Sequence, residues 1–449
     1  MTNVLILMSD EHNATISSVY GHPRVETPNM ERLAREGTVH DAAYCPSPLC
    51  TPSRSSFVSG LPVHRTQAYN NCNVVQFDYP GYGGVLADQG VHTVSVGKTD
   101  TYTTWDRLGF SETFLPGDRK TPGDINFCRE PLAQRTDGAR RAAEFGPRDD
   151  ASAKDLERVD TTLDWLHNTA PTLGQPWTLT VNLIAPHFPH YAAPDLWEKY
   201  EDAADLPEHG VDAESAQHPY AVDLRQHFQA DAFTVEQVRG NRRGYLARVD
   251  FVDRQLGRLL DALEATGQRD DTVVVYTSDH GEMLGKFGLW WKSAMYDDAA
   301  RVPLIVAGPG FDAGVRCGTA VTLLDVQATM FRATGADRPS DWWGEPLQDV
   351  PLDDDERVAI AEYHGHGTRS GTFLVRKGRW KLLYHGAAPH QLFDLEADPE
   401  ELDNRYDREP QVAADLECEL RRRCDPDAEI ARAHAFERHQ LDLLAATTA

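Results

Sequence analysis

One stretch of the chain, residues 50–60, combines a cysteine, a proline and an arginine at spacings that suit the binding and attack of an anion. Pro52 favours the first turn of a helix, because a missing N–H costs nothing there, and this predicts a helix that begins just after Cys50. Cys50 would then lie beside unpaired backbone N–H groups and the positive end of the helix dipole, where anions bind. Arg54, one turn later, would add donors on the same side. A free cysteine alone is more often a small buried hydrophobic residue, so this interpretation depends on the other segments.

Acidic residues follow two of the predicted strands. The apolar run at residues 3–8 is typical of a buried parallel strand and leads to Asp10 and Glu11. The most strand-like run of the chain leads to Asp279 and His280. Because ligands bind at the carboxyl ends of the strands in open α/β sheets, these residues are candidate metal ligands, although a lone Asp there would be an ordinary loop residue. Oxygen ligands favour a hard divalent cation, and Ca²⁺ is the first candidate. Mg²⁺ and Mn²⁺ are alternatives, and the histidine is compatible with Mn²⁺.

Basic residues follow other predicted strands. Lys98 comes after the apolar run at residues 92–96, and His187 comes after the run at residues 177–184. Lys292 follows two tryptophans. Taken singly, each would be a surface charge or part of a solvated loop. Brought together with the acids, they could surround the oxygens of a bound ester and offset the charge of a transition state.

The elements that would position these groups predict an α/β fold with a large, mostly parallel central sheet flanked by helices. We expect residues 101–151, which lack hydrophobic periodicity, to form long loops around the site. Amphipathic helices are expected at residues 152–167, 239–266 and 323–334, and buried strands at residues 3–8, 92–96, 177–184, 272–277 and 302–307.

The pattern changes near residue 355, where short runs separated by turns predict a small antiparallel sheet. The sequence therefore predicts a catalytic domain at residues 1–354 and a smaller α+β subdomain at residues 355–449, whose helices could support a homo-oligomer. Strands are expected at residues 358–362, 372–376 and 380–384, and helices at residues 410–423 and 429–444.

Composition and charge limit which kinds of partner and which cellular location the sequence predicts. The 449-residue chain has a net charge of −26, which argues against nucleic acid or an anionic membrane as a partner and means that any anion site must be locally basic. The 7 cysteines are odd in number and lack paired spacing, so we expect reduced thiols. The first apolar run has no basic residues before it and ends too soon for a signal peptide, and no run is long enough to span a membrane. These features predict a cytoplasmic protein.

Several motifs together resemble the type I sulfatases of the alkaline phosphatase superfamily, nearest to the choline-sulfatase and phosphonate monoester hydrolase side. The resemblance extends over nearly the whole chain and implies an alkaline-phosphatase-like fold. The motifs are Cys50-Thr51-Pro52-Ser53-Arg54, Gly97-Lys98, Pro186-His187, Ser278-Asp279-His280-Gly281 and Trp291-Lys292.

The resemblance also implies a reaction. A maturation enzyme would convert Cys50 to formylglycine, whose hydrate attacks the sulfur of a small aryl, alkyl or carbohydrate sulfate ester. Residue 50 would share one divalent cation with the four candidate ligands Asp10, Glu11, Asp279 and His280. His187 and Lys292 would bind the sulfate and protonate the departing oxygen.

Two positions depart from the family pattern. Glu11 stands where most sulfatases have Asp, and Asp100 stands where the family usually has the His that helps to release sulfate. Asp100 must then act as the base, or His190 or His12 must replace it. Two other functions stay open: a phosphonate monoester or phosphodiester hydrolase that uses the same residues, and a sulfatase-like binding protein without turnover.

Overall fold

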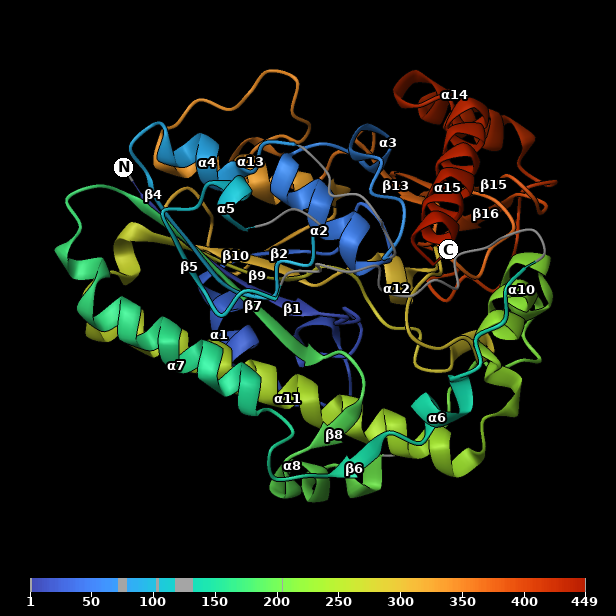
Figure 1. The fold of residues 1–449 in the computed structure, drawn as a ribbon, viewed down its shortest axis with the longest axis horizontal. Coiled ribbons are helices and arrows are strands. Elements are labelled where there is room, and N and C mark those ends of the chain that lie inside the picture. Colours follow the sequence, from blue (N-terminus) through green and yellow to red (C-terminus); the bar gives the residue numbers. More distant parts are fainter. Residues whose placement is uncertain (1, 72–78, 102–104, 118–131, 204, 449) are drawn as a thin grey trace.

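The computed structural model describes residues 2–71, 79–101, 105–117, 132–203 and 205–448 (Figure 1). Cys72 and Cys128 lie outside these residues. The described cysteines, Cys45, Cys50, Cys317, Cys418 and Cys424, are all free thiols.

A central sheet of eight strands in the order β11-β2-β10-β9-β1-β7-β4-β5 organises the chain. Most neighbouring strands are parallel, as predicted, but β10 runs antiparallel to both β9 and β2. The strands are β1 (Asn3–Asp10), β2 (Gly37–His40), β4 (His92–Gly97), β5 (Glu112–Phe114), β7 (Trp177–Pro186), β9 (Thr272–Ser278), β10 (Leu304–Ala307) and β11 (Val315–Cys317).

Strand β1 shows why the sheet is buried on both faces. Its side chains alternate, so Leu5 and Leu7 belong to one hydrophobic cluster while Val4, Ile6 and Met8 belong to another. All five are at most 1% exposed. A continuous apolar run without polar alternation is therefore what this strand requires.

Helices cover both faces of the sheet (Figure 1). One layer contains α1 (Pro28–Glu36), α7 (Ala153–Asn168) and α11 (Val235–Ala265); the other contains α2 (Cys50–Ser59), α4 (Tyr82–Ala87) and α13 (Leu323–Thr334). Helix α11 begins before the predicted boundary because Thr234 and Gln237 form a capping box. Helix α2 begins at Cys50 itself rather than after it.

Shorter elements connect these layers, and four of them lie in the segment that was expected to form only loops: α5 (Trp105–Leu108), β5, α6 (Gly138–Ala142) and β6 (Phe145–Pro147). Such short elements depend on tertiary contacts rather than on periodicity. The others are β3 (Ala43–Tyr44), α3 (Val63–Thr66), β8 (His190–Ala192), α8 (Pro194–Lys199), α9 (Glu214–Gln217), α10 (Pro219–Phe228), α12 (Asp297–Ala300) and β12 (Val321–Thr322).

The C-terminal part forms the separate antiparallel sheet that the sequence predicted, in the order β13-β14-β15-β16. Its members are β13 (Val358–Tyr363), β14 (Thr372–Lys377), β15 (Trp380–His385) and β16 (Gln391–Asp394), followed by α14 (Pro410–Arg423) and α15 (Pro426–Thr448). Buried Lys381 ties this sheet to the rest of the chain, because its Nζ donates to Asp297 and Glu401, each at 2.6 Å. The domain boundary at residue 354 stays a prediction. Of the helices described, none has the length and apolar character needed to cross a membrane.

Candidate active site

The carboxyl ends of β1 and β9 bring two acidic segments together. These strands are parallel neighbours with Ser9 opposite Ser278, so Asp10 and Asp279 leave the sheet at the same edge. Glu11 has a φ of 69°, which is uncommon for a residue with a side chain, and its N–H donates to Oδ1 of Asp279 at 3.2 Å. All three carboxyl groups are fully buried.

Arg54 links the two aspartates. Its Nε donates to Oδ2 of Asp279 at 2.7 Å, and its Nη2 donates to Oδ2 of Asp10 at 3.1 Å. Its Nη1 donates at 3.0 Å both to the carbonyl of Lys98 and to Oδ1 of Asn182. The sequence predicts that Arg54 adds donors on the side where an anion would bind; in the structure its planar array of donors contacts the two acids.

The pKa values of the two aspartates differ although Arg54 contacts both. Burial would raise the pKa of Asp10, but Lys98 and His187 outweigh it and hold that pKa well below its usual value. Burial raises the pKa of Asp279, and Arg54 offsets this only in part. Asp10 is therefore the more firmly ionised of the pair.

Cys50, the first residue of α2, lies against His280. Nε2 of His280 is 3.3 Å from Sγ of Cys50, and Nδ1 of His280 donates to the carbonyl of Gly281 at 3.0 Å. Because a carbonyl only accepts, Nδ1 carries a proton, and Nε2 is left for Cys50 or for a cation. Burial would raise the pKa of Cys50, but Lys292 and Lys98 lower it well below its usual value. An anionic atom is therefore favoured at this position.

The side chains that surround Cys50 fit a divalent cation. Asp10, Cys50, Asp279 and His280 each offer a ligand atom, and these atoms lie within 4.8 Å of one another. Within the described residues, the buried Oδ1 of Asp10 has no hydrogen-bond partner. A buried carboxylate oxygen without a donor costs free energy, and a cation would supply the missing partner.

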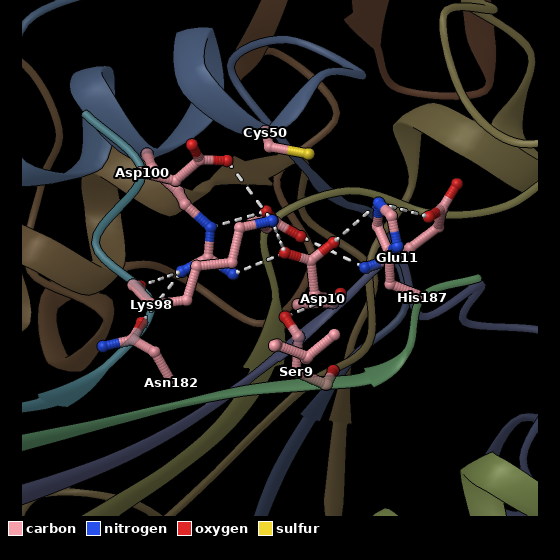
Figure 2. A network of polar contacts seen from close by, with 12 residues as sticks. Ser9, Asp10, Glu11, Cys50, Lys98, Asp100, Asn182 and His187 are labelled. Atoms are coloured by element: carbon pink, nitrogen blue, oxygen red, sulfur yellow. Dashed lines mark hydrogen bonds and ion pairs between the residues drawn. The ribbon is translucent and has the colours of Figure 1, made fainter. Parts of the chain in front are cut away.

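Lys98 and Asp100 lie on one side of Asp10, and Glu11 and His187 lie on the other (Figure 2). Nζ of Lys98 contacts Oδ2 of Asp10 and lies 3.3 Å from Oδ2 of Asp100. Burial would lower the pKa of Lys98, but Asp10 raises it above its usual value, so this lysine is charged at neutral pH.

On the other side, His187 and Lys292 meet at one oxygen of Glu11. Nζ of Lys292 lies 3.1 Å and Nε2 of His187 lies 3.3 Å from Oε2 of Glu11. Both residues line a cavity of about 130 Å³. A larger cavity of about 560 Å³ contains none of the predicted site residues, so the smaller one is the candidate substrate pocket.

The two histidines considered as replacements for the base are engaged elsewhere. Nδ1 of His12 lies 2.6 Å from the hydroxyl of Tyr276, and Nδ1 of His190 lies 2.8 Å from Oδ1 of Asn241. Burial lowers the pKa of each histidine to about 4. Asp100 is the better placed of the three candidates.

Several residues that contact the candidate site or line its cavity could not be predicted from the sequence. Asn182 contacts Arg54 from within β7, and an amide in an apolar run was its only signal. Glu282 accepts from the backbone N–H of Trp291 at 2.5 Å and so holds the loop that carries the catalytic candidate Lys292. Arg135 and Arg141 line the small cavity but come from a segment without periodicity, where nothing marked them.

Comparisons with known proteins agree with this geometry. The sulfatase family profile matches residues 2–336, and the profile described as N-sulphoglucosamine sulphohydrolase, C-terminal, matches residues 285–425. The chain is 32% identical over 427 residues to the choline-sulfatase of Rhizobium meliloti (strain 1021), covering 90% of this chain and 82% of the relative. It is 26% identical over 481 residues to human arylsulfatase K, covering 98% of this chain and 85% of the relative.

Solved structures share the fold. A phosphonate monoester hydrolase from Silicibacter pomeroyi has a TM-score of 0.74 at 25% identity and covers 94% of each chain. A protein solved in complex with its substrate D-glucosamine-2-N,6-O-disulfate has a TM-score of 0.74 at 21% identity and covers 95% of this chain and 99% of its own. With most of its length matched by the family profile, the chain belongs to the sulfatase family of hydrolases.

Proposed function

We propose that the chain is a formylglycine-dependent sulfatase that hydrolyses a small aryl, alkyl or carbohydrate sulfate ester. The observation that carries this proposal is the convergence of Cys50 with Asp10, Asp279 and His280 at the start of α2. The relatives named choline-sulfatase and arylsulfatase K support a sulfate ester as the substrate.

In this proposal Asp10, Glu11, Asp279 and His280 hold one divalent cation, with Ca²⁺ as the first candidate and Mg²⁺ or Mn²⁺ as alternatives. The bound cation would polarise an ester oxygen and offset negative charge. Formylglycine at residue 50 would supply a covalent nucleophile and so divide one difficult step into two.

The remaining residues act on protons and oxygens at the two sides of the site. Nζ of Lys292 and Nε2 of His187 lie beside the substrate cavity, where they would bind sulfate oxygens and protonate the departing oxygen. On the opposite side, Oδ2 of Asp100 would accept the proton that must leave before sulfate is released, and Lys98 would bind a sulfate oxygen.

The mass of the peptide that contains residue 50, taken from protein made in its native host, tests the proposal. An aldehyde at that position is the expected result, and an intact thiol in fully active protein would refute the mechanism. Protein from a host without a maturation enzyme serves as the control, since it should retain the thiol and lack turnover.

A phosphonate monoester or phosphodiester hydrolase is the second candidate, because the same residues would serve it and a phosphonate monoester hydrolase shares the fold at 25% identity. Turnover of 4-nitrophenyl sulfate should exceed that of phenyl phosphonate esters, and a large preference for the phosphonate would favour the alternative. A binding protein without turnover is a third candidate, motivated by Glu11 and Asp100. It predicts that a sulfate ester binds but is not cleaved even when residue 50 is modified.

The cellular setting is also part of the proposal. A cytoplasmic location, a formylglycine-generating partner and a homo-oligomer formed through α14 and α15 are each expected from the sequence. Sedimentation of the purified protein would test the last of these directly.

A further inference from the structure

The cavity beside the site is lined by basic and aromatic side chains from separate segments of the chain. It measures about 130 Å³, close to the roughly 150 Å³ that accommodates one benzene molecule. A leaving group of about one ring would therefore fill it. The residues that matter here are Arg135, Arg141, Phe188, Trp291, Lys292 and His366.

Two arginines in this cavity share one carboxylate. Arg135 donates from Nε and Nη2 to the two oxygens of Asp137, at 2.9 and 3.1 Å. Arg141 donates only from Nε, to Oδ2 of Asp137 at 2.8 Å. Within the described residues, Nη1 and Nη2 of Arg141 have no hydrogen-bond acceptor. The trio therefore keeps a net positive charge and a free pair of donors.

The aromatic faces of the cavity are already occupied by protein cations. The guanidinium carbon of Arg141 lies 4.8 Å from the ring centre of Phe188 and 5.8 Å from that of Trp291. Nζ of Lys292 lies 5.5 Å from the ring centre of Phe188. A quaternary ammonium group needs such faces free, and here it would meet like charges.

The charge of the residues around the cavity also disfavours a cationic group there. His366 has a pKa well below its usual value because of burial and of His227, with further contributions from Arg135, Arg141 and Lys292. In the described part of the chain, no carboxylate lines the cavity. The cavity is therefore a positive region in a protein whose net charge is −26.

We propose that this cavity binds a second anionic group on the leaving portion of the substrate, with that anion on Arg141 and the ring of the leaving group in the space lined by Phe188 and Trp291. This inference rests on the proposed function, since it names the class of ester that the same site would accept. The substrate is then a sulfate ester of a ring that bears a carboxylate or a second sulfate, and choline-O-sulfate is disfavoured.

Turnover of matched esters tests the preference. With residue 50 confirmed as formylglycine, kcat/KM for 3-carboxyphenyl sulfate should exceed that for its methyl ester by roughly tenfold or more, as expected for a charge-assisted contact. Comparing 3-carboxyphenyl sulfate with 1,3-phenylene disulfate distinguishes a carboxylate subsite from a sulfate subsite. Equal rates for acid and methyl ester, or a preference for choline-O-sulfate, would overturn the inference.

Variants assign the preference to one side chain. Arg141→Gln should lower the acid-to-methyl-ester ratio by about tenfold, and Arg141→Lys should keep part of it, because Lys retains the charge without the fork. Each ratio compares the same two leaving groups in both proteins, so differences in their intrinsic reactivity cancel. Arg140→Gln is the matched control, since Arg140 is its exposed neighbour on α6. An unchanged ratio in folded Arg141→Gln would overturn the assignment.

Binding separates this inference from the proposed function. Full-length protein with an unmodified Cys50 should bind 3-carboxyphenyl sulfate more tightly than the methyl ester in calorimetry, and Arg141→Gln should remove the difference. That result would support the subsite even if the modified protein cleaved no sulfate ester, in which case the proposed function alone would fail. Turnover of both esters with no difference in binding would leave the proposed function standing and refute the subsite.

Discussion

Nε2 of His280 lies 3.3 Å from Sγ of Cys50, although the two residues are 230 positions apart in the sequence. This contact places Sγ of Cys50, the first residue of α2, among the carboxylates of Asp10 and Asp279. It ties the reactivity of residue 50 to the residues that would hold a cation.

Removing the side chain of residue 50 should therefore remove turnover while the fold survives. Cys50→Ala is expected to lower kcat for 4-nitrophenyl sulfate by at least about 10⁴-fold, because loss of a nucleophile removes covalent catalysis altogether. Cys45→Ala is the matched control, since Cys45 is an equally buried thiol on a neighbouring segment. Comparable losses in both variants would show that packing, rather than a nucleophile, explains the effect.

Asp279→Asn should abolish cation retention and turnover together. The substitution takes the charge from a buried ligand and leaves Arg54 with one ionised partner, Asp10. Added Ca²⁺ or Mn²⁺ should raise the melting temperature of the unaltered protein but not that of the variant, because only a binding-competent native state gains stability from a ligand. Normal activity and a normal cation response in the variant would contradict the ligand assignment.

Much of the fold could be predicted because local sequence patterns indicate the individual helices and strands. The strands β1, β7 and β9 are continuous apolar runs, and helix α13 has helical hydrophobic periodicity, so each can be recognised from its own residues. The early start of α11 does have a local signal, because Thr234 and Gln237 have the spacing of a capping box. The antiparallel direction of β10 had none, because strand direction depends on the connections and not on composition.

The site, like the fold, has residues whose positions the sequence predicts and others whose positions it does not. Asp10 is the last residue of β1, and Lys98 and Asp279 directly follow β4 and β9, so their place at the carboxyl ends of strands predicts that they meet. What Arg54 does could not be predicted, because its direction toward the acids rather than the substrate depends on side-chain packing. Arg141 comes from a segment without hydrophobic periodicity, and only the folded chain brings it to the cavity.

Arg54→Lys tests whether a planar array of donors is needed behind the carboxylates. Lysine keeps the charge but cannot bridge Asp10 and Asp279 at once, so we expect cation affinity to fall by about 10- to 100-fold, as for other residues that orient ligands. Calorimetric titration with Ca²⁺ measures this. Arg65 is an exposed arginine on α3, so Arg65→Lys is the control for replacing an arginine by lysine. Equal Ca²⁺ affinities in the two variants would contradict the proposed role of Arg54.

The contact between α3 and β13 should make stability depend on pH. Nδ1 of His64 lies 2.6 Å from Oε1 of Glu362. Burial would lower the pKa of His64, but Glu362 raises it above its ordinary value of 6.5. A folded-state pKa above the unfolded one stabilises the protein fully below pH 6.5, and this stabilisation is lost as pH rises through the raised pKa.

Glu362, the partner of His64, makes stability depend on pH in the acidic range. Burial would raise the pKa of Glu362, but His64 and other contacts lower it to about 2 from 4.5, so its stabilisation is present above pH 4.5 and lost as pH falls toward 2. His64→Gln should cost about 1–3 kcal/mol of unfolding free energy at pH 6 and less at pH 9, measured by urea denaturation. His167→Gln, at an exposed position, should follow the unaltered protein at both pH values. A constant difference between His64→Gln and the unaltered protein would exclude the ion pair as its cause.

Asp100→Asn tests which group releases sulfate. Asp100 lies beside Lys98 and away from the leaving-group cavity, so its loss should spare the first half of the reaction and slow the second. We expect a burst of 4-nitrophenol equal to the enzyme concentration, followed by steady turnover lowered by about 10²- to 10⁴-fold, the usual contribution of a general base. Stopped-flow absorbance resolves the two phases. If Asp100→Asn turned over steadily while His190→Asn showed the burst, the base would be His190 despite its contact with Asn241, and the departure at position 100 would be tolerated rather than functional.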